Sequence, residues 1–425
     1  MNDKRLPAWL TILFYLVFQN IIAQPPDNGE NDFLLALMRN KLPKFGYILD
    51  NPSKYRLQII YTKIDRDEKN LPVLTTYYYR KLPNEFISPA SMVKLPLSIL
   101  TLERIKSMNV PGVDRYTRFS TDSNFRCQVA TTKDLFAFDS IPTLSGSITE
   151  ALVLSNNNAY NRLYEFLGQM EINRRMRELG YLHSQILQRF SLCDTMENRH
   201  TNSFSFYDKK GTIIYWQVNR FNPETYPKPI KNMVVGKKYL DEHDRIVQRG
   251  MDFSRKNYLP LYQVDDILKR VIFPGLYPEN KRFRVSPGDL DYIRRLLALR
   301  PAEAGINIIP VKKEYWETVT NYLFYGAEKE TIIPENIRIF NIVGQSFGFL
   351  SDCAYYADFS NRIEFFLSAT IYVNSNNTIN DGIYEYKSIG LPFLKKLGEV
   401  ICDYELRRQV KQRPNLSEME KLFNP

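Results

Sequence analysis

Apolar residues recur at helical spacing in several separate stretches of the chain. In the first stretch, Leu34, Leu35 and Met38 follow a capping residue, Asn31 or Asp32, which is the pattern of an amphipathic helix. The same spacing predicts helices over residues 31–42, 91–105, 148–180, 262–271, 287–299 and 389–410.

Short runs rich in β-branched and aromatic residues mark both ends of the chain. They predict strands over residues 55–64, 72–80, 336–343, 354–359 and 362–373. The last run is apolar on both faces, as a central strand would be. These positions predict an α/β fold, in which the N- and C-terminal segments form one antiparallel sheet flanked by helices. A mostly helical lobe is inserted between the two segments.

The chain changes character after residue 200. Alternating runs at 204–207 and 212–217 flank a polar tetrapeptide, which predicts a hairpin, and prolines then interrupt any long element. We interpret residues 201–250 as an insertion that decorates the helical lobe. The predicted organisation is a leader (1–23), one two-lobed domain (24–410; α/β lobe 31–85 plus 300–410, helical lobe 86–299) and a loosely held tail (411–425).

The formal net charge of +10 is spread over mixed basic and acidic residues. This charge indicates solubility and some attraction to anionic surfaces. The basic residues form no cluster in the sequence, so we expect no nucleic-acid partner. Three scattered histidines and four single cysteines form no metal-binding spacing, so we expect no metal and no cofactor. The cysteines are Cys127, Cys193, Cys353 and Cys402, and the sequence leaves their pairing open.

The first residues have the plan of a secretory signal peptide. Lys4 and Arg5 precede an apolar run that ends near Ala23, and polar residues follow. Ile21 fits poorly at the third position before the cut, so an uncleaved anchor is the alternative. The mature protein is therefore expected to be periplasmic or secreted, with contact to a membrane only through this leader.

One polar pair, Ser91 and Lys94, opens the apolar helical run 91–105. Residues three apart on a helix share a face, and an amine that is kept neutral can take the proton of a hydroxyl and make it nucleophilic. The alternative is a capping serine beside a solvated lysine. Because S-x-x-K arises by chance about once in a chain of this length, the pair gains weight only from further motifs.

A second polar cluster interrupts the helical pattern of residues 148–180. It consists of Ser155 and the three asparagines that follow it, Asn156, Asn157 and Asn158. A helix cap after a loop is the ordinary reading of any one of these residues. Four of them between apolar helices suggest a site as well.

These residues resemble the motifs of the class A β-lactamase and penicillin-binding serine hydrolase superfamily, S-x-x-K, S-D-N and K-T-G in that order. Here S-x-x-K is residues 91–94, S-D-N is residues 155–157 with Asn in the middle place, and K-T-G is residues 342–344. The resemblance covers roughly residues 32–402 and implies a β-lactamase-like fold.

The resemblance implies a role for each matching residue. Ser91 would be the nucleophile that opens a β-lactam or a related amide, Lys94 would take or polarise its proton, and Ser155 would pass a proton to the leaving nitrogen. Asn157 would hold the amide side chain of the substrate. Next to Gly344, the backbone N–H of Gln345 would form an oxyanion hole with that of Ser91.

The sequence departs from the family at two places. Ile342 stands where the family has lysine, and Asn341 should point to the other face of the strand, so it is no replacement. Class A enzymes also activate the deacylating water with Glu and an Asn four residues later. Asp194 and Asn198 have that spacing with a shorter acid, and Glu197 has the longer side chain at the wrong spacing.

The sequence therefore favours an exported serine hydrolase of β-lactamase type, monomeric and acting on a small-molecule or peptidoglycan-derived substrate. The alternative within the same fold is a domain that binds a penicillin or a cell-wall fragment without turnover. A structural envelope protein with accidental motifs is the third reading, and it requires Ser91 and Ser155 to lie far apart.

Overall fold

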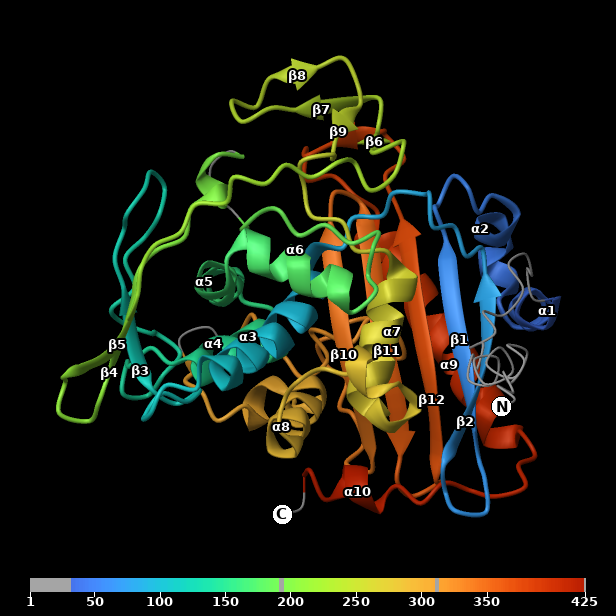
Figure 1. Cartoon of the computed structure of the whole chain (residues 1–425). Coiled ribbons are helices and arrows are strands. Elements are labelled where there is room, and N and C mark those ends of the chain that lie inside the picture. The colour runs from blue at the N-terminus through green and yellow to red at the C-terminus, as the bar shows by residue number, and fades with distance from the viewer. Residues whose placement is uncertain (1–31, 191–194, 310–312, 424–425) are drawn as a thin grey trace, which may run out of the picture.

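A five-stranded antiparallel sheet forms the centre of the computed structural model, which describes residues 32–190, 195–309 and 313–423 (Figure 1). The strand order is β10-β11-β12-β1-β2, so the N-terminal hairpin joins the C-terminal strands through the β1–β12 pair. The strands are β1 Gln58–Arg66, β2 Pro72–Tyr79, β10 Ile337–Ser346, β11 Phe349–Asp358 and β12 Ile363–Tyr372. This confirms the predicted fold class and sheet. The predicted leader lies outside the described residues.

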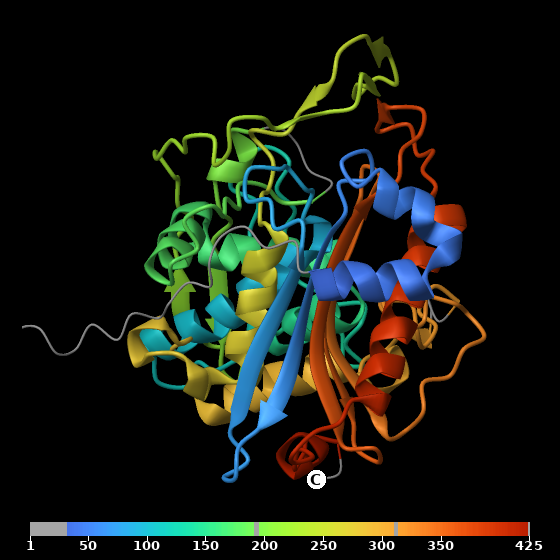
Figure 2. The same ribbon diagram turned by 90° about the vertical axis from the view of Figure 1, so that its right-hand side faces the viewer.

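Helices cover both faces of this sheet. As a result, every residue of β11 and β12 is buried. For β12 the two-sided apolar pattern predicted this burial. One face packs against α1 Asp32–Lys41, α2 Gly46–Asp50 and α9 Leu391–Arg407 (Figure 2). The other face packs against the helical lobe, with α7 Leu261–Ile272 and α8 Pro287–Ala298 nearest to the strands.

The region predicted to be helical from 148 to 180 forms three helices. They are α4 Leu144–Val153, α5 Asn157–Leu167 and α6 Gln169–Glu178. The first break falls at the polar cluster, and the second falls at Gly168, whose φ of 79° favours glycine. α5 lies in the middle of the lobe, and it packs against α3 Lys94–Met108 and α4. The polar cluster therefore sits where a central helix begins.

The segment after residue 200 forms three small sheets (Figure 1). β4 Phe204–Tyr207 and β5 Ile213–Gln217 form the predicted hairpin beside β3 Arg118–Thr121. Two short sheets follow, made of β6 Val234–Val235 with β9 Met251–Asp252, and of β7 Lys238–Leu240 with β8 Ile246–Val247 and β13 Thr378–Ile379. Because β7 pairs with β13, this segment rests on the loop that follows β12.

The expectation of a loosely held tail was wrong for the described part of residues 411–425. Leu416 and Met419 are buried, the latter in the short helix α10 Ser417–Glu420, and the Phe423 ring lies 5.9 Å from that of Phe340 on β10. These apolar side chains cover the lobe side of the sheet, which the charged sequence around them concealed.

The described residues contain no helix that is both long and apolar enough to cross a bilayer. Cys353 and Cys402 are free thiols, whereas Cys127 is in a disulfide.

Gly344 allows strand β10 to approach the turn η2 Ala90–Val93, which precedes α3. A Cβ at this glycine would lie 2.5 Å from the carbonyl oxygen of Pro89 and 3.3 Å from both Ala90 Cβ and Met92 Cγ. Because the nearest of these atoms belongs to the backbone, it cannot move aside as a side chain can. The absence of a side chain at Gly344 therefore sets how closely the sheet meets the helical lobe.

We expect Gly344→Ala to lower the free energy of unfolding by about 1–3 kcal/mol, since the added methyl group overpacks this contact. Gly288→Ala is the matched control, because nothing lies within 4 Å of a Cβ built at Gly288 in α8. Urea denaturation of both variants measures the difference. Equal stability of the two variants would show that the contact is loose.

Candidate active site

Ser91 lies in the turn η2, three residues before α3 begins at Lys94, and it is partly exposed. The residue before it, Ala90, has a φ of 44°, a left-handed conformation that is costly for alanine. Lys94 follows at the start of α3, and its Nζ donates to Ser91 Oγ at 2.7 Å. The structure therefore brings the S-x-x-K pair into direct contact.

Ser155 and Asn157 approach the same amine from the junction of α4 and α5. Lys94 Nζ lies 3.0 Å from Ser155 Oγ, 2.5 Å from Ser155 O and 2.9 Å from Asn157 Oδ1. Ser155 has a φ of 54°, so its carbonyl and its hydroxyl both reach the amine. Asn156 caps α5, because its Oδ1 accepts from the backbone N–H groups of Asn158 and Ala159. The middle asparagine thus fixes the helix, and its two neighbours face Lys94.

Lys94 is fully buried, and no carboxylate of the described residues forms an ion pair with it. Burial disfavours the charged form and lowers the pKa of Lys94 to about 7. An ammonium group has three hydrogens for the four oxygens around it. A neutral amine has two hydrogens and a lone pair that can accept the hydroxyl proton of Ser91. Near neutral pH both forms are populated, as a general base requires.

The loop before residue 191 places an aromatic ring beside this amine. The Phe190 ring centroid is 5.3 Å from Lys94 Nζ. Asn161 of α5 holds the backbone of Phe190 at both ends, since its Nδ2 donates to Phe190 O at 2.9 Å and its Oδ1 accepts from Phe190 N at 2.7 Å. The sequence did not single out Phe190. The only signal was Asn161, six residues after Ser155 on the face of a buried helix.

A buried arginine fixes the same loop. Arg189 pairs with Glu165 of α5 and donates to the backbone carbonyl of Glu197, each at 2.5 Å. Its backbone N–H donates to Asn198 Oδ1 at 2.7 Å. Charged groups held in this way rigidify the loop, because breaking one contact leaves a buried charge unpaired.

Of the residues weighed as partners for a deacylating water, the two that the structure describes, Glu197 and Asn198, bind other groups. Asp194 lies outside the described residues. Glu197 pairs with Arg126 at 2.8 Å, and the amide oxygen of Asn198 binds Arg189. Neither Glu197 nor Asn198 has a hydrogen bond to Ser91 or Lys94 in the described part of the chain. Clusters of His, Cys, Asp and Glu that could hold a metal are also absent from the described residues.

Strand β10 borders the site on the side of the sheet, next to the turn that carries Ser91. Ile342 is buried in the core on the lobe side, so this position offers no positive charge. Asn341 points to the other face, where its Nδ2 donates to Asp352 Oδ1 at 2.9 Å, as the strand alternation predicted. Beyond Gly344, Ser346 Oγ lies 2.7 Å from Ser88 Oγ and ties the strand to the segment that leads to Ser91.

The hairpin register decides where the backbone of Gln345 points. The two-residue turn Phe347–Gly348 makes Ser346 and Phe349 the closing pair of β10 and β11. Hydrogen-bonded and non-bonded pairs alternate along an antiparallel ladder, so the next pair, Gln345 with Leu350, is non-bonded. The N–H of Gln345 therefore points away from β11, toward the free edge of β10, on the side where Gly344 meets the turn η2.

This arrangement can support acyl transfer. It holds a partly exposed hydroxyl against an amine of lowered pKa, and a second partly exposed hydroxyl lies on the same amine. The backbone N–H of Gln345 points from the free edge of strand β10 on the side of the turn η2 that carries Ser91. Ser91 and Ser155 therefore lie close together, since both contact Lys94. The hypothesis of a structural protein with accidental motifs required them to be far apart.

We compared the sequence with models of known protein families and with curated proteins. Residues 71–213 match the Beta-lactamase enzyme family, a range that holds the first two motifs and ends before the third. No curated protein matches the sequence.

Among solved structures, a class A β-lactamase from Mycobacterium abscessus is 14% identical, with a TM-score of 0.46, covering 88% of this chain and 98% of that chain. A β-lactamase from Burkholderia phymatum is 12% identical, with a TM-score of 0.46 and coverage of 88% and 100%. An ancestral class A β-lactamase is 12% identical, with a TM-score of 0.46 and coverage of 85% and 98%. With TM-scores below 0.5, these similarities decide nothing about activity. The family match confirms, over residues 71–213, the resemblance to the β-lactamase-like serine hydrolase superfamily that the motifs predicted.

Proposed function

We propose that this protein is an exported serine hydrolase in which Ser91 is acylated by a β-lactam or a related amide. The observation that carries the proposal is the contact of Ser91 Oγ with a buried amine that has no carboxylate partner among the described residues and a pKa of about 7. A lysine in water stays charged at this pH and cannot take a proton.

The proposed reaction uses the groups in the order of their contacts. Ser91 Oγ attacks the carbonyl carbon as its proton passes to Lys94 Nζ, and the N–H groups of Ser91 and Gln345 stabilise the oxyanion. The C–N bond then breaks. The leaving nitrogen takes a proton from Ser155 Oγ, which is replenished from Lys94. The product is an ester at Ser91 and a free amine, and water releases the acid in a second step.

A second candidate is a domain of the same fold that is acylated and holds the adduct. The observation that favours it is Phe190, because the loop presents an aromatic ring and not a carboxylate to Lys94. Water next to the ester then lacks a dedicated base, and Lys94 is the only described group in contact with Ser91 that can serve. The two candidates share the acylation step and differ in the lifetime of the ester.

Export is part of the proposal. The apolar leader supports it, and so does the disulfide at Cys127, since disulfides persist in oxidising compartments. Hydrolysis of a β-lactam there would give antibiotic resistance.

Incubation with a penicillin and measurement of the intact mass tests the first step. We expect one adduct of the mass of the penicillin on the wild-type protein and none on Ser91→Ala, because Ser91 is the proposed nucleophile. Ser155 also contacts Lys94, but in the proposal it only passes a proton to the leaving nitrogen. Ser107→Ala, an exposed serine at the end of the same helix, should label as the wild type does. An adduct that persists for hours identifies the binding candidate, and a folded wild-type protein without any adduct or hydrolysis contradicts both.

The acylation rate should depend on pH through Lys94. Because its pKa is lowered to about 7, the amine is charged and inactive below pH 7 and neutral above it, so the rate constant should rise and level off with a midpoint near 7. Lys94→Arg should lose this rise and fall about 100-fold or more, since arginine stays charged. Acylation followed by mass from pH 5 to pH 9 measures both. A rate that does not change over this range would argue against Lys94 as the base.

A further inference from the structure

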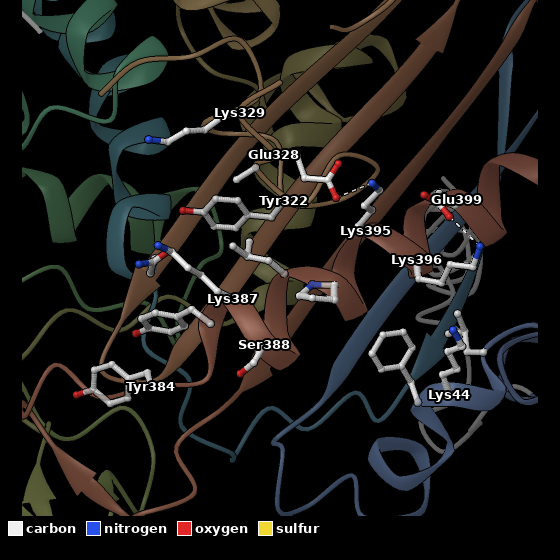
Figure 3. Close-up of a pocket in the computed structure, with 18 of the residues that line it drawn as sticks. Lys44, Tyr322, Glu328, Lys329, Tyr384, Lys387, Ser388, Lys395, Lys396 and Glu399 are labelled. Atoms are coloured by element: carbon white, nitrogen blue, oxygen red, sulfur yellow. Dashed lines mark hydrogen bonds and ion pairs between the residues drawn. The ribbon is translucent and has the colours of Figure 1, made fainter. Parts of the chain in front are cut away.

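A large groove lies on the side of the sheet that carries α9, away from the helical lobe (Figure 3). Its volume is about 1310 Å³, above the range of typical small-molecule pockets. Its walls come from the start of α9 with the preceding turn η8 Tyr386–Gly390, from the turns over residues 316–329, and from the short helix η1 Pro43–Phe45. Gln345 of β10 lines it as well, so the groove reaches the strand end that borders the serine site.

The charge of the groove is strongly positive. Six lysines and two glutamates line it. Both glutamates are already neutralised, because Lys395 pairs with Glu328 at 2.6 Å and Lys396 pairs with Glu399 at 2.8 Å. Four lysines remain without an ion pair within the described chain, namely Lys41, Lys44, Lys329 and Lys387. Four positive charges that face one hollow without internal counterions favour an anionic ligand.

The hydroxyl of a largely buried tyrosine, Tyr322, also points into this groove (Figure 3). Tyr322 is 8% exposed, and its hydroxyl has no hydrogen-bond partner among the described residues. Figure 3 shows this hydroxyl and the amines of Lys329 and Lys387 directed to the same side of the groove. Asp352 holds the backbone in place, since its Oδ2 accepts from the N–H groups of Tyr322 and Leu323. A ligand oxygen at this point would satisfy a donor that the protein itself leaves unused.

Fixed aromatic rings line the rest of the groove. Trp316 Nε1 donates to the carbonyl of Ala327 at 3.0 Å, and the Tyr386 hydroxyl accepts from the N–H of Gly348 at 2.8 Å. Tyr384 and Phe45 also line the groove. Rings held in this way offer flat apolar surfaces without a further loss of conformational freedom on binding. The C–H faces of sugar rings fit such surfaces.

The backbone of the groove suits a peptide poorly. Gln345 is the one lining residue that belongs to a strand of the described chain. The other lining residues lie in helices and turns whose backbone N–H groups are largely used, as those of Phe45, Gly326 and Ala327 are. An extended peptide would therefore find no strand edge along the groove.

We propose that this groove binds an acidic oligosaccharide, with its carboxylates on the unpaired lysines and the Tyr322 hydroxyl and its sugar rings on the aromatic side chains. The inference goes beyond acylation and does not depend on the reactivity of Ser91.

Calorimetric titration of the whole protein with a hexuronate oligosaccharide tests the proposal, with a neutral oligosaccharide of equal length and an oligoglutamate peptide as competing probes. We expect the hexuronate to bind at least tenfold more tightly than either. Lys329→Gln with Lys387→Gln should weaken it about tenfold. Lys209→Gln with Lys210→Gln, exposed lysines of the β4–β5 turn without ion pairs, makes the same charge change elsewhere and should alter the affinity less than twofold.

Tyr322→Phe removes only the hydroxyl and should weaken the hexuronate about threefold while the melting temperature stays unchanged. Equal affinity of the two double variants would overturn the site. Tighter binding of oligoglutamate would overturn the ligand class. Penicillin labelling of the same samples separates this inference from the proposed function, since loss of labelling with hexuronate binding retained overturns only the reactivity of Ser91.

Discussion

The desolvation of one amine is the constraint on which the serine site depends. Lys94 is enclosed at the start of α3 without a carboxylate in the described chain, and moving a lone ammonium out of water is costly. A counterion would remove this cost but would return the amine to its charged form. The site instead surrounds the amine with neutral oxygens from Ser91, Ser155 and Asn157. These neutral oxygens can accept hydrogen bonds from both the charged and the neutral amine, so neither protonation state of Lys94 is strongly favoured near pH 7.

Local backbone strain supports this arrangement. Ala90 and Ser155 both have left-handed φ values, and each lies at the contact between a catalytic candidate and the next helix. Such conformations cost about 1–3 kcal/mol each and persist only where the surroundings determine them. The surroundings here are the cap of α5 by Asn156 and the approach of β10 at Gly344. Packing energy of the lobe and sheet thus holds Ser91, Lys94 and Ser155 in place.

The two faces of β10 have divided roles. On the lobe side, Ile342 is an apolar residue of the core, so this position adds no positive charge to the serine site. On the other side, Asn341 and Asp352 are buried together, and burial raises the pKa of Asp352 to about 7. This pair anchors the turn of Tyr322, where unpaired lysines gather. The strand therefore separates the candidate serine site, whose only described cation is the buried Lys94, from a groove lined by unpaired lysines.

Periodicity and order along the chain determined much of this protein. Apolar spacing located the main strands and helices, because local sequence sets which faces must be buried. The spacing of Ser91 and Lys94 brought these two side chains together, since residues three apart on a helix share a face. Ser155 and Asn157 were found through the order of the motifs that the chain resembles. What only the tertiary structure decided are contacts between distant segments. Phe190 reaches Lys94 because Asn161 holds its backbone, the tail packs on Phe340, and the groove joins segments near residues 44, 322 and 387. No local pattern encodes these contacts, because burial of Lys94 and the charge around Tyr322 arise only when remote parts of the chain exclude water together.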